Sequence, residues 1–484
     1  MNVHDSDRMV EVLRSAGGLG AERIEEADLV VFNTCSVRDK AEQKLRSAVG
    51  TLAPLKRARP QLIIAVAGCV AQQEGAALLR DLPYVDIVLG PDHVAELPAL
   101  LAEQLAGAPP TSRTEFDIAA PRFLTWPTRP LASGAPERSP AIAFVTTMKG
   151  CDERCTFCIV PYTRGPERYR SAFDVVDEVQ RLVELGTREV VLLGQTVDSF
   201  RDPSLPLSTF DDASDSSVAQ GDESQFPALL YRLAEAVPTF DVARSNSPGL
   251  ARLRYASPHP RHATASLARA HAELDVLAHH VHLPVQSGSD HVLRRMVRRY
   301  TSAEYVSRAE RLMRARSGLT LSTDIIVGFP GETEVDFEQT LELVRHVGFT
   351  SIFGFKYSPR PFTPALRLGD DVSEDVKSSR LERLFELSDD LSRAHLARLV
   401  GTRQRVLVEG PSKSEKGSLA GDRVQGRTDR NEMVHLSHRG AAGLVGKIVD
   451  VTIVQANRHS LLGTLDDSTP PVRLARRRLP VVES

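Results

Sequence analysis

Three of the five cysteines lie within eight residues, in the stretch KGCDERCTFCIV, where they are spaced CxxxCxxC. Thiolates are the usual ligands of zinc and of iron–sulfur clusters, and a closed structural site normally takes four ligands. The stretch supplies only Cys151, Cys155 and Cys158, and the next histidine, His259, lies far downstream. The spacing therefore favours a [4Fe–4S] cluster whose fourth iron is left for a small molecule. A zinc knuckle or chance spacing is the alternative.

The rest of the composition is typical of a protein in a reducing compartment. The other two cysteines, Cys35 and Cys69, are far apart, and five is an odd number, so a disulfide framework is not expected. No apolar run approaches the ~20 residues of a membrane span, and the polar, amphipathic N-terminus lacks a secretory core. We expect a cytoplasmic protein without membrane contact. The net charge of −3 does not decide for or against a nucleic-acid partner, because local charge matters more than the sum.

Residues 1–106 alternate between helix and strand patterns and predict an α/β domain with an open sheet. The stretches ADLVVFNTCS and LIIAVAGCV are short apolar runs typical of buried parallel strands. Each places its cysteine, Cys35 or Cys69, at or just past its carboxyl end, which is the sheet edge where sites form. Residues 107–140 are rich in Pro, Ala, Ser and Arg and are predicted to be a linker.

Repeated strand and helix signals over residues 141–375 predict a (β/α) barrel or partial barrel. Apolar runs such as EVVLLGQ, LRYASPHP and LSTDIIVGFPGE end in polar or Gly/Pro turns, with helical stretches between them. Residues 202–226 interrupt this pattern with six acidic residues, many serines and no basic residue. That composition predicts a solvated, disordered insertion.

The C-terminal part is predicted to begin with a connecting helix over 376–400. Short strand patterns over 401–467 then predict a small all-β barrel, and 468–484 form a basic tail. From residue 393 to the end there are 16 Lys/Arg and 9 Asp/Glu. A basic, OB-like barrel favours an RNA-binding module, with a solvated surface that has no partner as the alternative.

The stretch GCDERCTFCIVPYTRG, after the first strand of a βα array, resembles the radical S-adenosylmethionine superfamily. The resemblance implies that Cys151, Cys155 and Cys158 hold the catalytic [4Fe–4S] cluster and that S-adenosylmethionine chelates its open iron. An electron from the cluster would cleave this cofactor to methionine and a 5′-deoxyadenosyl radical. The missing fourth ligand is then the working position of the cluster.

Further stretches resemble the methylthiotransferase family in order and spacing, over nearly the whole chain: FNTCSVRDKAEQK, AGCVAQQEG, IVPYTRG, HLPVQSGSD, STDIIVGFPGET and YSPRPFTPA. The implied fold is an N-terminal α/β domain, a central radical-SAM partial barrel and a C-terminal TRAM barrel. MNVHDSD, NTCSVRDKA and GCVAQQ resemble the branch that acts on isopentenylated adenosine in tRNA. Phe362 stands where the family usually has glycine, which affects the shape of that loop.

The family carries a second [4Fe–4S] cluster on three cysteines of its N-terminal domain. Two of them map onto Cys35 and Cys69; without the resemblance, both would be taken as inert buried thiols. The first belongs to a GCQMN motif directly before the position of Met1, so this ligand and its strand are absent from the sequence. We expect that the start was assigned at an internal methionine. The alternative is a short chain with an impaired auxiliary cluster.

The resemblance implies a reaction in two parts. One S-adenosylmethionine methylates a sulfur on the auxiliary cluster, and a second yields the radical that takes hydrogen from C2 of N6-isopentenyladenosine at tRNA position 37, where the methylthio group attaches. That base should be splayed out of its stack. The implied partners of the monomer are tRNA, a flavodoxin-type electron donor and a sulfur donor.

Three alternatives to this function stay open at this point. The same chemistry could act on threonylcarbamoyladenosine tRNA or on a ribosomal protein. In another class, the chain would be a catalytically impaired, RNA-binding iron–sulfur protein.

Polar residues at predicted strand ends are candidates for holding S-adenosylmethionine, with turn or capping duty as an equal alternative for each. They are Gln195, Ser257, Gln286 and Asp324. After the cysteine loop, Arg164 and Arg170 could meet a carboxylate or a phosphate, or could be solvated.

Arg427, Lys447 and Arg458, in the predicted C-terminal barrel, are candidate contacts to RNA phosphates. The tail stretch VRLARRR could add affinity that does not depend on sequence, or only solubility.

Overall fold

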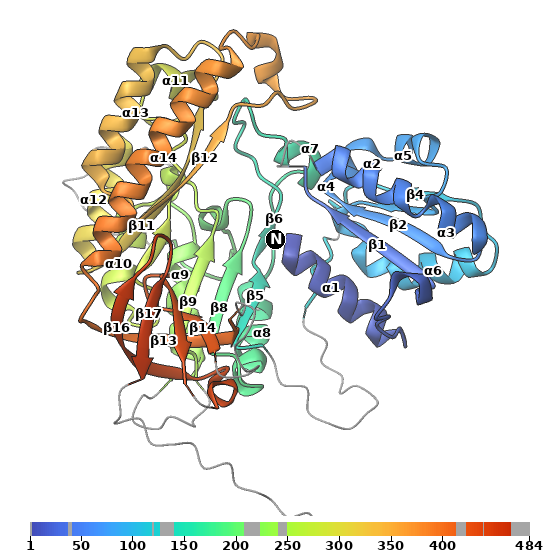
Figure 1. The fold of residues 1–484 in the computed structure, drawn as a ribbon, viewed down its shortest axis with the longest axis horizontal. Coiled ribbons are helices and arrows are strands. Elements are labelled where there is room, and N and C mark those ends of the chain that lie inside the picture. Colours follow the sequence, from blue (N-terminus) through green and yellow to red (C-terminus); the bar gives the residue numbers. More distant parts are fainter. Residues whose placement is uncertain are drawn as a thin grey trace, which may run out of the picture.

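Three parts make up the computed structural model: an N-terminal α/β domain, a curved array of strands with helices on its outside, and a small β barrel (Figure 1). This arrangement confirms the predicted fold class. The domain boundaries given above stay a prediction. The structure describes residues 2–36, 41–118, 121–125, 140–207, 223–240, 249–412, 423–438 and 440–465. Most of the acidic insertion and the whole region after residue 465, including the predicted basic tail, lie outside these residues.

A four-stranded parallel sheet forms the N-terminal domain, in the order β1-β2-β3-β4. Its strands are β1 (Leu29–Thr34), β2 (Ile63–Gly68), β3 (Ile87–Leu89) and β4 (Thr111–Arg113). Both faces are covered, which explains why β2 is apolar and buried along its whole length. The helices are α1 (Asn2–Ser15), α2 (Ala41–Thr51), α3 (Ala53–Ala58), α4 (Cys69–Glu74), α5 (Ala77–Asp81) and α6 (Leu97–Leu105).

The predicted linker, residues 107–140, contains strand β4. Its three residues, Thr-Ser-Arg, carry no apolar signal, and they join the sheet by pairing in register with Ile87–Leu89. The stability of such a short polar edge strand comes from hydrogen bonds to the backbone of its neighbour, so the local sequence does not predict it.

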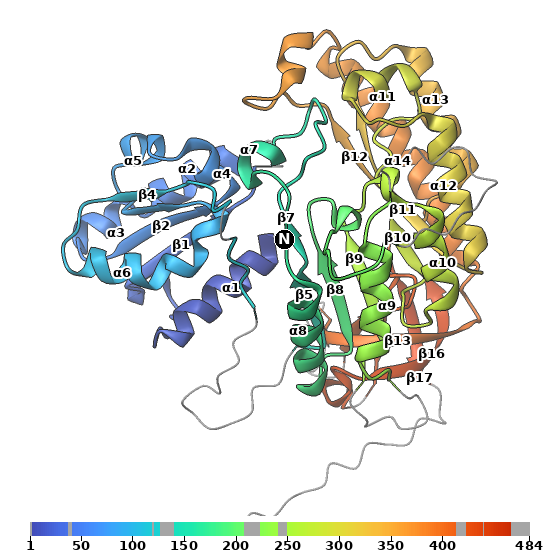
Figure 2. The same cartoon turned by 180° about the vertical axis from the view of Figure 1, so that it is seen from behind.

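Two parallel three-stranded sheets form the central part, and a bridge between Leu253 and Leu277 connects them. Helices cover the outer side, which gives the partial barrel that the βα repeats predict (Figure 2). The first sheet contains β5 (Ile142–Thr146), β8 (Glu189–Leu193) and β9 (Arg252–Ala256). The second contains β10 (His280–His282), β11 (Thr320–Val327) and β12 (Ser351–Lys356). The outer helices are α8 (Ala172–Glu184), α9 (Phe226–Ala236), α10 (Ala265–Glu273), α12 (Ser302–Ala315) and α13 (Glu334–Val347).

The C-terminal part begins with the long helix α14 (Glu374–Ala397). Five strands then close into a barrel in the order β13-β14-β15-β17-β16 around a buried aliphatic core. They are β13 (Arg403–Pro411), β14 (Arg423–Arg427), β15 (Met433–Ser437), β16 (Ile448–Ala456) and β17 (Leu461–Leu465). None of the described helices is long and apolar enough to cross a membrane.

The C-terminal barrel is fastened to the amino ends of the central strands by a buried arginine. Arg252, the first residue of β9, is 2% exposed. It donates to the carbonyl oxygens of Arg427 (2.8 Å) and Arg405 (3.0 Å) and is paired with Asp429 and, at 3.4 Å, with Glu189. These contacts place the barrel at the end of the central strands opposite to their carboxyl ends.

Candidate functional site

The cysteine loop joins two short strands that pair with each other. These are β6 (Met148–Lys149) and β7 (Arg168–Tyr169), and their antiparallel pairing holds the two ends of the loop together. Gly150 begins the loop with φ +80°, and a Cβ there would lie 1.9 Å from the Pro166 carbonyl oxygen. Only glycine fits at such a point. After the third cysteine, the helix α7 (Val160–Arg164) leads back toward β7.

The three thiols of this loop are enclosed by protein. Cys151 and Cys155 are buried and Cys158 is half-buried. Burial raises the pKa of the Cys158 thiol to about 12, with the neighbouring Cys155 adding to the shift, and it raises the pKa of Cys151 as well. Such thiols stay protonated in the protein alone, and a bound metal deprotonates them because it supplies the compensating positive charge.

Two polar groups contact the sulfur atoms directly. The Thr196 hydroxyl lies 3.0 Å from Cys151 Sγ. Arg298 Nη1 donates to Cys155 Sγ at 3.2 Å, while its other nitrogens donate to the Tyr300 hydroxyl (2.9 Å) and the Pro284 carbonyl (3.1 Å). No carboxylate of the described chain lies within ion-pair distance of this buried guanidinium. A buried cation needs a counter-charge, so the site suits an anionic group bound at the thiols.

The loop fits an iron–sulfur cluster better than a single ion. Within the described residues, no three His, Cys, Asp or Glu side chains form a group that could hold one metal ion. A cubane differs from such a site because each thiolate binds a separate iron. Three enclosed thiols on one loop, with a guanidinium against one of them, have the donor chemistry that a [4Fe–4S] cluster requires.

Three further polar side chains near the loop each have one buried atom without a hydrogen-bond partner among the described residues. The atoms are Glu153 Oε2, Asp198 Oδ2 and His259 Nε2. Asp198 Oδ1 accepts from the His259 backbone N–H at 2.8 Å, and burial raises the pKa of Asp198 and lowers that of His259. Unsatisfied buried polar atoms at a sheet edge suit a polar ligand. The sequence predictions missed all three, although Glu153 lies between two of the cysteines.

Cys35 and Cys69 lie side by side at one edge of the N-terminal sheet. They follow β1 and β2, whose last residues, Thr34 and Gly68, are paired in register. Gly68 has φ +93°, and a Cβ there would lie 2.4 Å from the Thr34 carbonyl oxygen, so the two strand ends approach closely. The predicted placement of both thiols at strand ends agrees with this geometry, while their ligand role stays a prediction.

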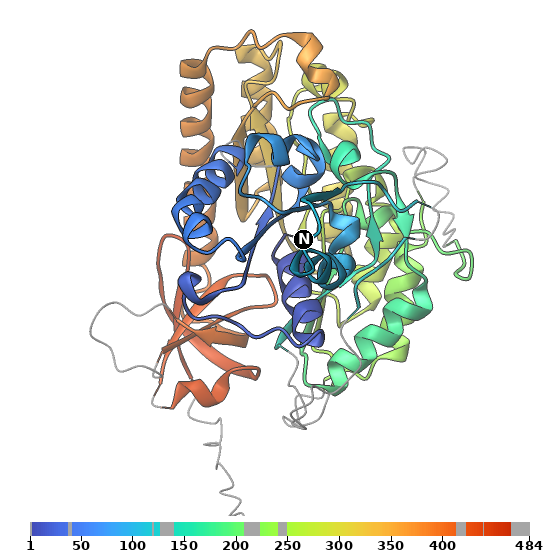
Figure 3. The same cartoon turned by 90° about the vertical axis from the view of Figure 1, so that its right-hand side faces the viewer.

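This edge faces the cysteine loop of the central part. Helix α4, which begins at Cys69, packs against α7 (Figures 1 and 2), and Figure 3 shows the N-terminal domain in front of the central part. Arg164, the last residue of α7, donates to Asp5 Oδ2 at 2.6 Å and lies close enough to Cys69 to interact electrostatically with its thiol. Burial lowers the pKa of Arg164, but Asp5 and Cys69 outweigh it and raise the pKa above its ordinary value. Helix α7, which follows the cysteine loop, therefore contacts the part of the N-terminal domain that carries Cys69.

Three of the predicted cofactor-binding residues, Gln195, Ser257 and Gln286, follow the carboxyl ends of central strands. The prediction that Asp324 lies at a strand end is wrong, because this residue lies within β11 and pairs with Phe353 of β12. Gln195 Oε1 accepts from the Gly150 N–H at 2.5 Å, and the Gln286 N–H donates to the Asp324 carbonyl at 2.9 Å. Ser257 (φ +61°) and Gln286 (φ +73°) have left-handed backbones, which are uncommon for such residues and concentrate at functional sites.

Arg170 differs from the other candidates because it is buried and already paired. It forms an ion pair with Glu178 and donates to the Asp174 carbonyl at 2.9 Å. Glu178 also lies 3.6 Å from Arg8 of the N-terminal helix. These contacts give Arg170 a place between the N-terminal and central domains, and its role toward a cofactor stays a prediction.

The three predicted RNA contacts lie on the C-terminal barrel and have different surroundings. Arg427 is paired with Glu409 at 3.0 Å, and the exposed Arg458 is paired with Asp389 of α14. Lys447 is half-buried in the turn before β16. Their contact with RNA stays a prediction.

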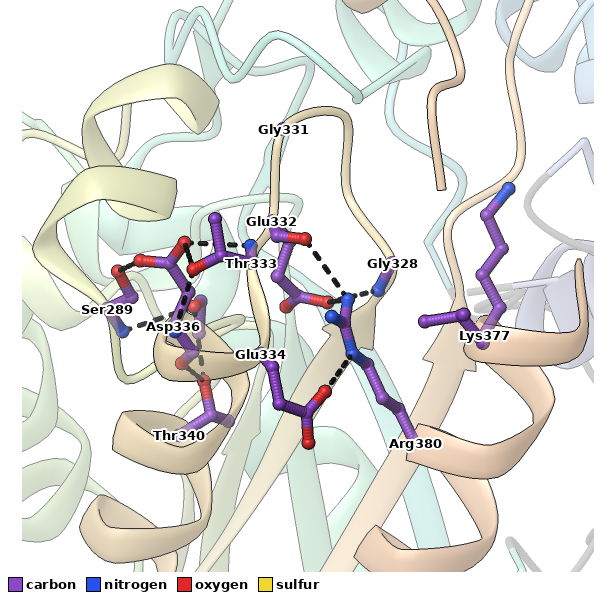
Figure 4. A network of polar contacts seen from close by, with 12 residues as sticks. Ser289, Gly328, Gly331, Glu332, Thr333, Glu334, Asp336, Thr340, Lys377 and Arg380 are labelled. Atoms are coloured by element: carbon purple, nitrogen blue, oxygen red, sulfur yellow. Dashed lines mark hydrogen bonds and ion pairs between the residues drawn. The ribbon is translucent and has the colours of Figure 1, made fainter. Parts of the chain in front are cut away.

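A polar network holds the turn after β11, which connects this strand to α13 (Figure 4). Glu332 accepts from the Gly328 N–H (2.6 Å) and from Arg380 (2.8 Å). Asp336 and Thr333 form a capping box at the start of α13, and Ser289 donates to Asp336 at 2.5 Å. A groove of about 810 Å³ lies beside this network, between α11 (Asp290–Met296), α12 and α13, outside the ring of strands and away from the cysteines.

Asp336→Asn is expected to lower stability at neutral pH and to have a smaller effect in acid. Burial raises the pKa of Asp336, but hydrogen bonds from Ser289 and Thr333 outweigh it and lower the pKa to about 2. The stability from this ionised group is therefore present above about pH 4, its unfolded value, and is lost as the pH falls toward 2. Loss of a cap costs about 0.5–2 kcal/mol. Urea unfolding at pH 7 and at pH 2.5 measures the difference, with the exposed Asp375→Asn as control. A destabilisation that is as large at pH 2.5 as at pH 7 contradicts the assignment.

The comparisons with known proteins agree with this division of the chain. The model described as "Uncharacterized protein family UPF0004" matches residues 1–90, the radical SAM superfamily matches 145–344, and the TRAM domain matches 397–465. A solved structure of the radical S-adenosylmethionine methyltransferase TsrM from Kitasatospora setae is 17% identical, with a TM-score of 0.45, over 70% of this chain and 63% of that chain.

Curated relatives match over the full length. A tRNA-2-methylthio-N(6)-dimethylallyladenosine synthase of Sorangium cellulosum is 57% identical over 100% of this chain and 97% of its own length. The protein of the same name from Bordetella avium is 42% identical over 96% of this chain and 90% of its own. With this identity, the three matched domains and the enclosed cysteine loop, the chain belongs to the tRNA-2-methylthio-N(6)-dimethylallyladenosine synthase family of the radical S-adenosylmethionine superfamily.

Proposed function

We propose that this protein attaches a methylthio group to C2 of N6-isopentenyladenosine at position 37 of tRNA. The observation that carries the proposal is the full-length match to synthases named for this product, at 57% identity for the relative from Sorangium cellulosum. The enclosed CxxxCxxC loop at the carboxyl edge of the central strands supports it, because radical chemistry needs a site from which water is excluded.

Each part of the site has a role in this proposal. Cys151, Cys155 and Cys158 hold the [4Fe–4S] cluster. Bound there, the cluster and S-adenosylmethionine supply the electron and the radical C–H chemistry, which protein side chains cannot perform alone. Arg298 balances the negative charge at Cys155, and Thr196 orients Cys151. Candidates for binding the methionine and ribose parts are Gln195, Ser257, Gln286, Asp324, Glu153, Asp198 and His259.

Cys35 and Cys69 are proposed as ligands of a second [4Fe–4S] cluster, which carries the sulfur to be transferred. Their position at one sheet edge, beside α7 of the central domain, supports this role. Arg164, at the end of the helix that follows the central cysteine loop, lies beside Cys69. A flavodoxin-type electron donor, a separate sulfur donor, and a cytoplasmic monomer that acts on tRNA through its TRAM barrel belong to the same proposal.

Nucleoside mass spectrometry of tRNA from a deletion strain tests this function. We expect the methylthio-isopentenyl nucleoside to disappear, the isopentenyl nucleoside to accumulate, and the wild-type chain to restore the product. Loss of methylthio-threonylcarbamoyladenosine, or of a methylthio group on a ribosomal protein, with unchanged isopentenyl products would reject it. A strain in which no methylthio modification changes would favour an RNA-binding protein without this catalysis.

A further inference from the structure

Two aromatic rings are exposed together beside the cysteine loop. Tyr162, in α7, is 42% exposed, and Phe362, in the loop after β12, is 61% exposed. Their ring centroids are 6.1 Å apart and the ring planes are tilted by 35°. Single exposed aromatic side chains are ordinary on protein surfaces. Two exposed rings that contact each other form a larger apolar patch, and such patches are typical of binding sites.

Phe362 also has a strained backbone. Its φ is +67°, in the left-handed region that a bulky residue rarely adopts and that glycine adopts freely. The turn is closed by Thr363, whose hydroxyl donates to the Arg360 carbonyl at 2.7 Å. The ring contributes little packing in return, because most of it faces solvent. Backbone strain that no packing of the side chain offsets is typical of residues in binding sites.

The pair lies at the rim of the cysteine loop. The Ala365 N–H donates to the Thr156 carbonyl at 2.9 Å, which fastens the loop after β12 to the segment between Cys155 and Cys158. Tyr162 follows the last of these cysteines by four residues. Figures 1 and 2 show the loop after β12 reaching toward α7 in both views.

The chain segments that carry the two rings also carry exposed arginines, which suit a polyanion. The segment Tyr357–Leu368 contains two arginines and no acidic residue. One of them, Arg367, is exposed, and so is Arg154 of the cysteine loop. Exposed guanidinium groups beside aromatic rings are the combination with which proteins hold single-stranded nucleic acid, phosphates on the cations and bases on the rings.

We propose that Tyr162 and Phe362 form a stacking platform for an unpaired base of the RNA substrate, next to the nucleotide that enters the site. The inference rests on the proposed function and adds a binding surface to it. Stacking on a ring is tolerant of base identity, because every base has a π face. The platform would therefore hold the RNA loop open beside the nucleotide that is modified. It would contribute affinity for RNA rather than preference for a base sequence.

Binding of a fluorescent anticodon stem-loop RNA to the full-length protein tests the platform. Tyr162→Ala, Phe362→Ala and Phe362→Gly are each expected to raise the Kd about tenfold, which corresponds to 1.4 kcal/mol. Phe362→Gly should at the same time melt at or above the wild-type temperature, because glycine relieves the strained φ. A merely structural role for Phe362 predicts unchanged binding in this variant. Phe173→Ala, at an exposed ring of α8 (79% exposed), is the matched control and should bind as wild type.

The outcomes separate this inference from the proposed function. If wild-type protein binds and modifies the RNA but all three variants bind it equally well, the platform is wrong and the function stands. A second outcome also overturns the inference: the variants bind RNA normally, are reduced by dithionite as fast as wild type, and are reduced by a flavodoxin more slowly. The rings would then contact the protein that donates electrons. If wild-type protein neither binds nor modifies the RNA, both proposals fail.

Discussion

Cys155→Ala is expected to reduce both the methylthiolated product and the release of 5′-deoxyadenosine to background. Cys155 is a buried thiol that carries the Arg298 hydrogen bond, and no other cysteine of the described chain is positioned to replace it. Even residues that only support a metal ligand cost about 10- to 100-fold when removed, so the loss of a ligand should exceed 100-fold. Anaerobic reconstitution followed by chromatography of the nucleoside products measures both effects.

Cys35→Ala is the matched comparison, because it removes one thiol from the other group. We expect it to abolish the methylthio product while 5′-deoxyadenosine still forms, since the central loop is untouched. Each variant should lose about four irons per chain relative to the wild-type protein if each group holds one cubane. Release of 5′-deoxyadenosine by Cys155→Ala at the wild-type rate would show that the central loop is not the radical centre.

Arg252→Met is expected to destabilise the attachment of the C-terminal barrel by about 3–5 kcal/mol, the usual cost of breaking a buried ion pair from one side. Arg252 joins Glu189 of the central sheet to Asp429 of the barrel and also satisfies two barrel carbonyl groups. Methionine fills a similar volume but donates no hydrogen bond. Urea unfolding and limited proteolysis should show the barrel becoming sensitive before the rest of the protein.

Arg423→Met is the control for this experiment, because Arg423 is an exposed arginine of the same barrel, on β14. Surface substitutions of this kind usually change stability by less than about 0.5 kcal/mol. Equal urea midpoints and equal protease sensitivity for the two variants would show that Arg252 does not fasten the barrel. Because the protein has several domains, the two readouts are needed together.

The features that the sequence predicts well are those with a local signal. Strand β1 begins with the apolar run Leu29–Phe32, β2 has no polar side chain, and each strand is followed directly by its cysteine, so both the strands and the shared edge could be derived. The closed C-terminal barrel follows in the same way from regularly spaced short strands. The loop of three thiols is visible because its residues are neighbours in the chain.

The features that the sequence does not reveal depend on distant residues. Arg298 and Cys155 are 143 positions apart, and nothing in the local pattern around either residue indicates the hydrogen bond between them. The pairing of Arg170 with Glu178 is similar. The sequence alone does not distinguish a buried, paired arginine from an exposed or ligand-binding one, because the fold decides which acid lies beside it. Strand β4 falls within the predicted linker because its stability comes from pairing with β3 rather than from its own side chains.

The C-terminal barrel is docked at the amino ends of the central strands, whereas the cysteine loop lies beyond their carboxyl ends. A strand of five residues, such as β9, is about 17 Å long. The C-terminal barrel and the cysteine loop are therefore separated by at least about the length of one strand. An RNA held by the barrel must cross that span before one of its bases reaches the thiols. Selection among the adenosines of an RNA loop would then depend on distance along the molecule as well as on the chemistry of the base.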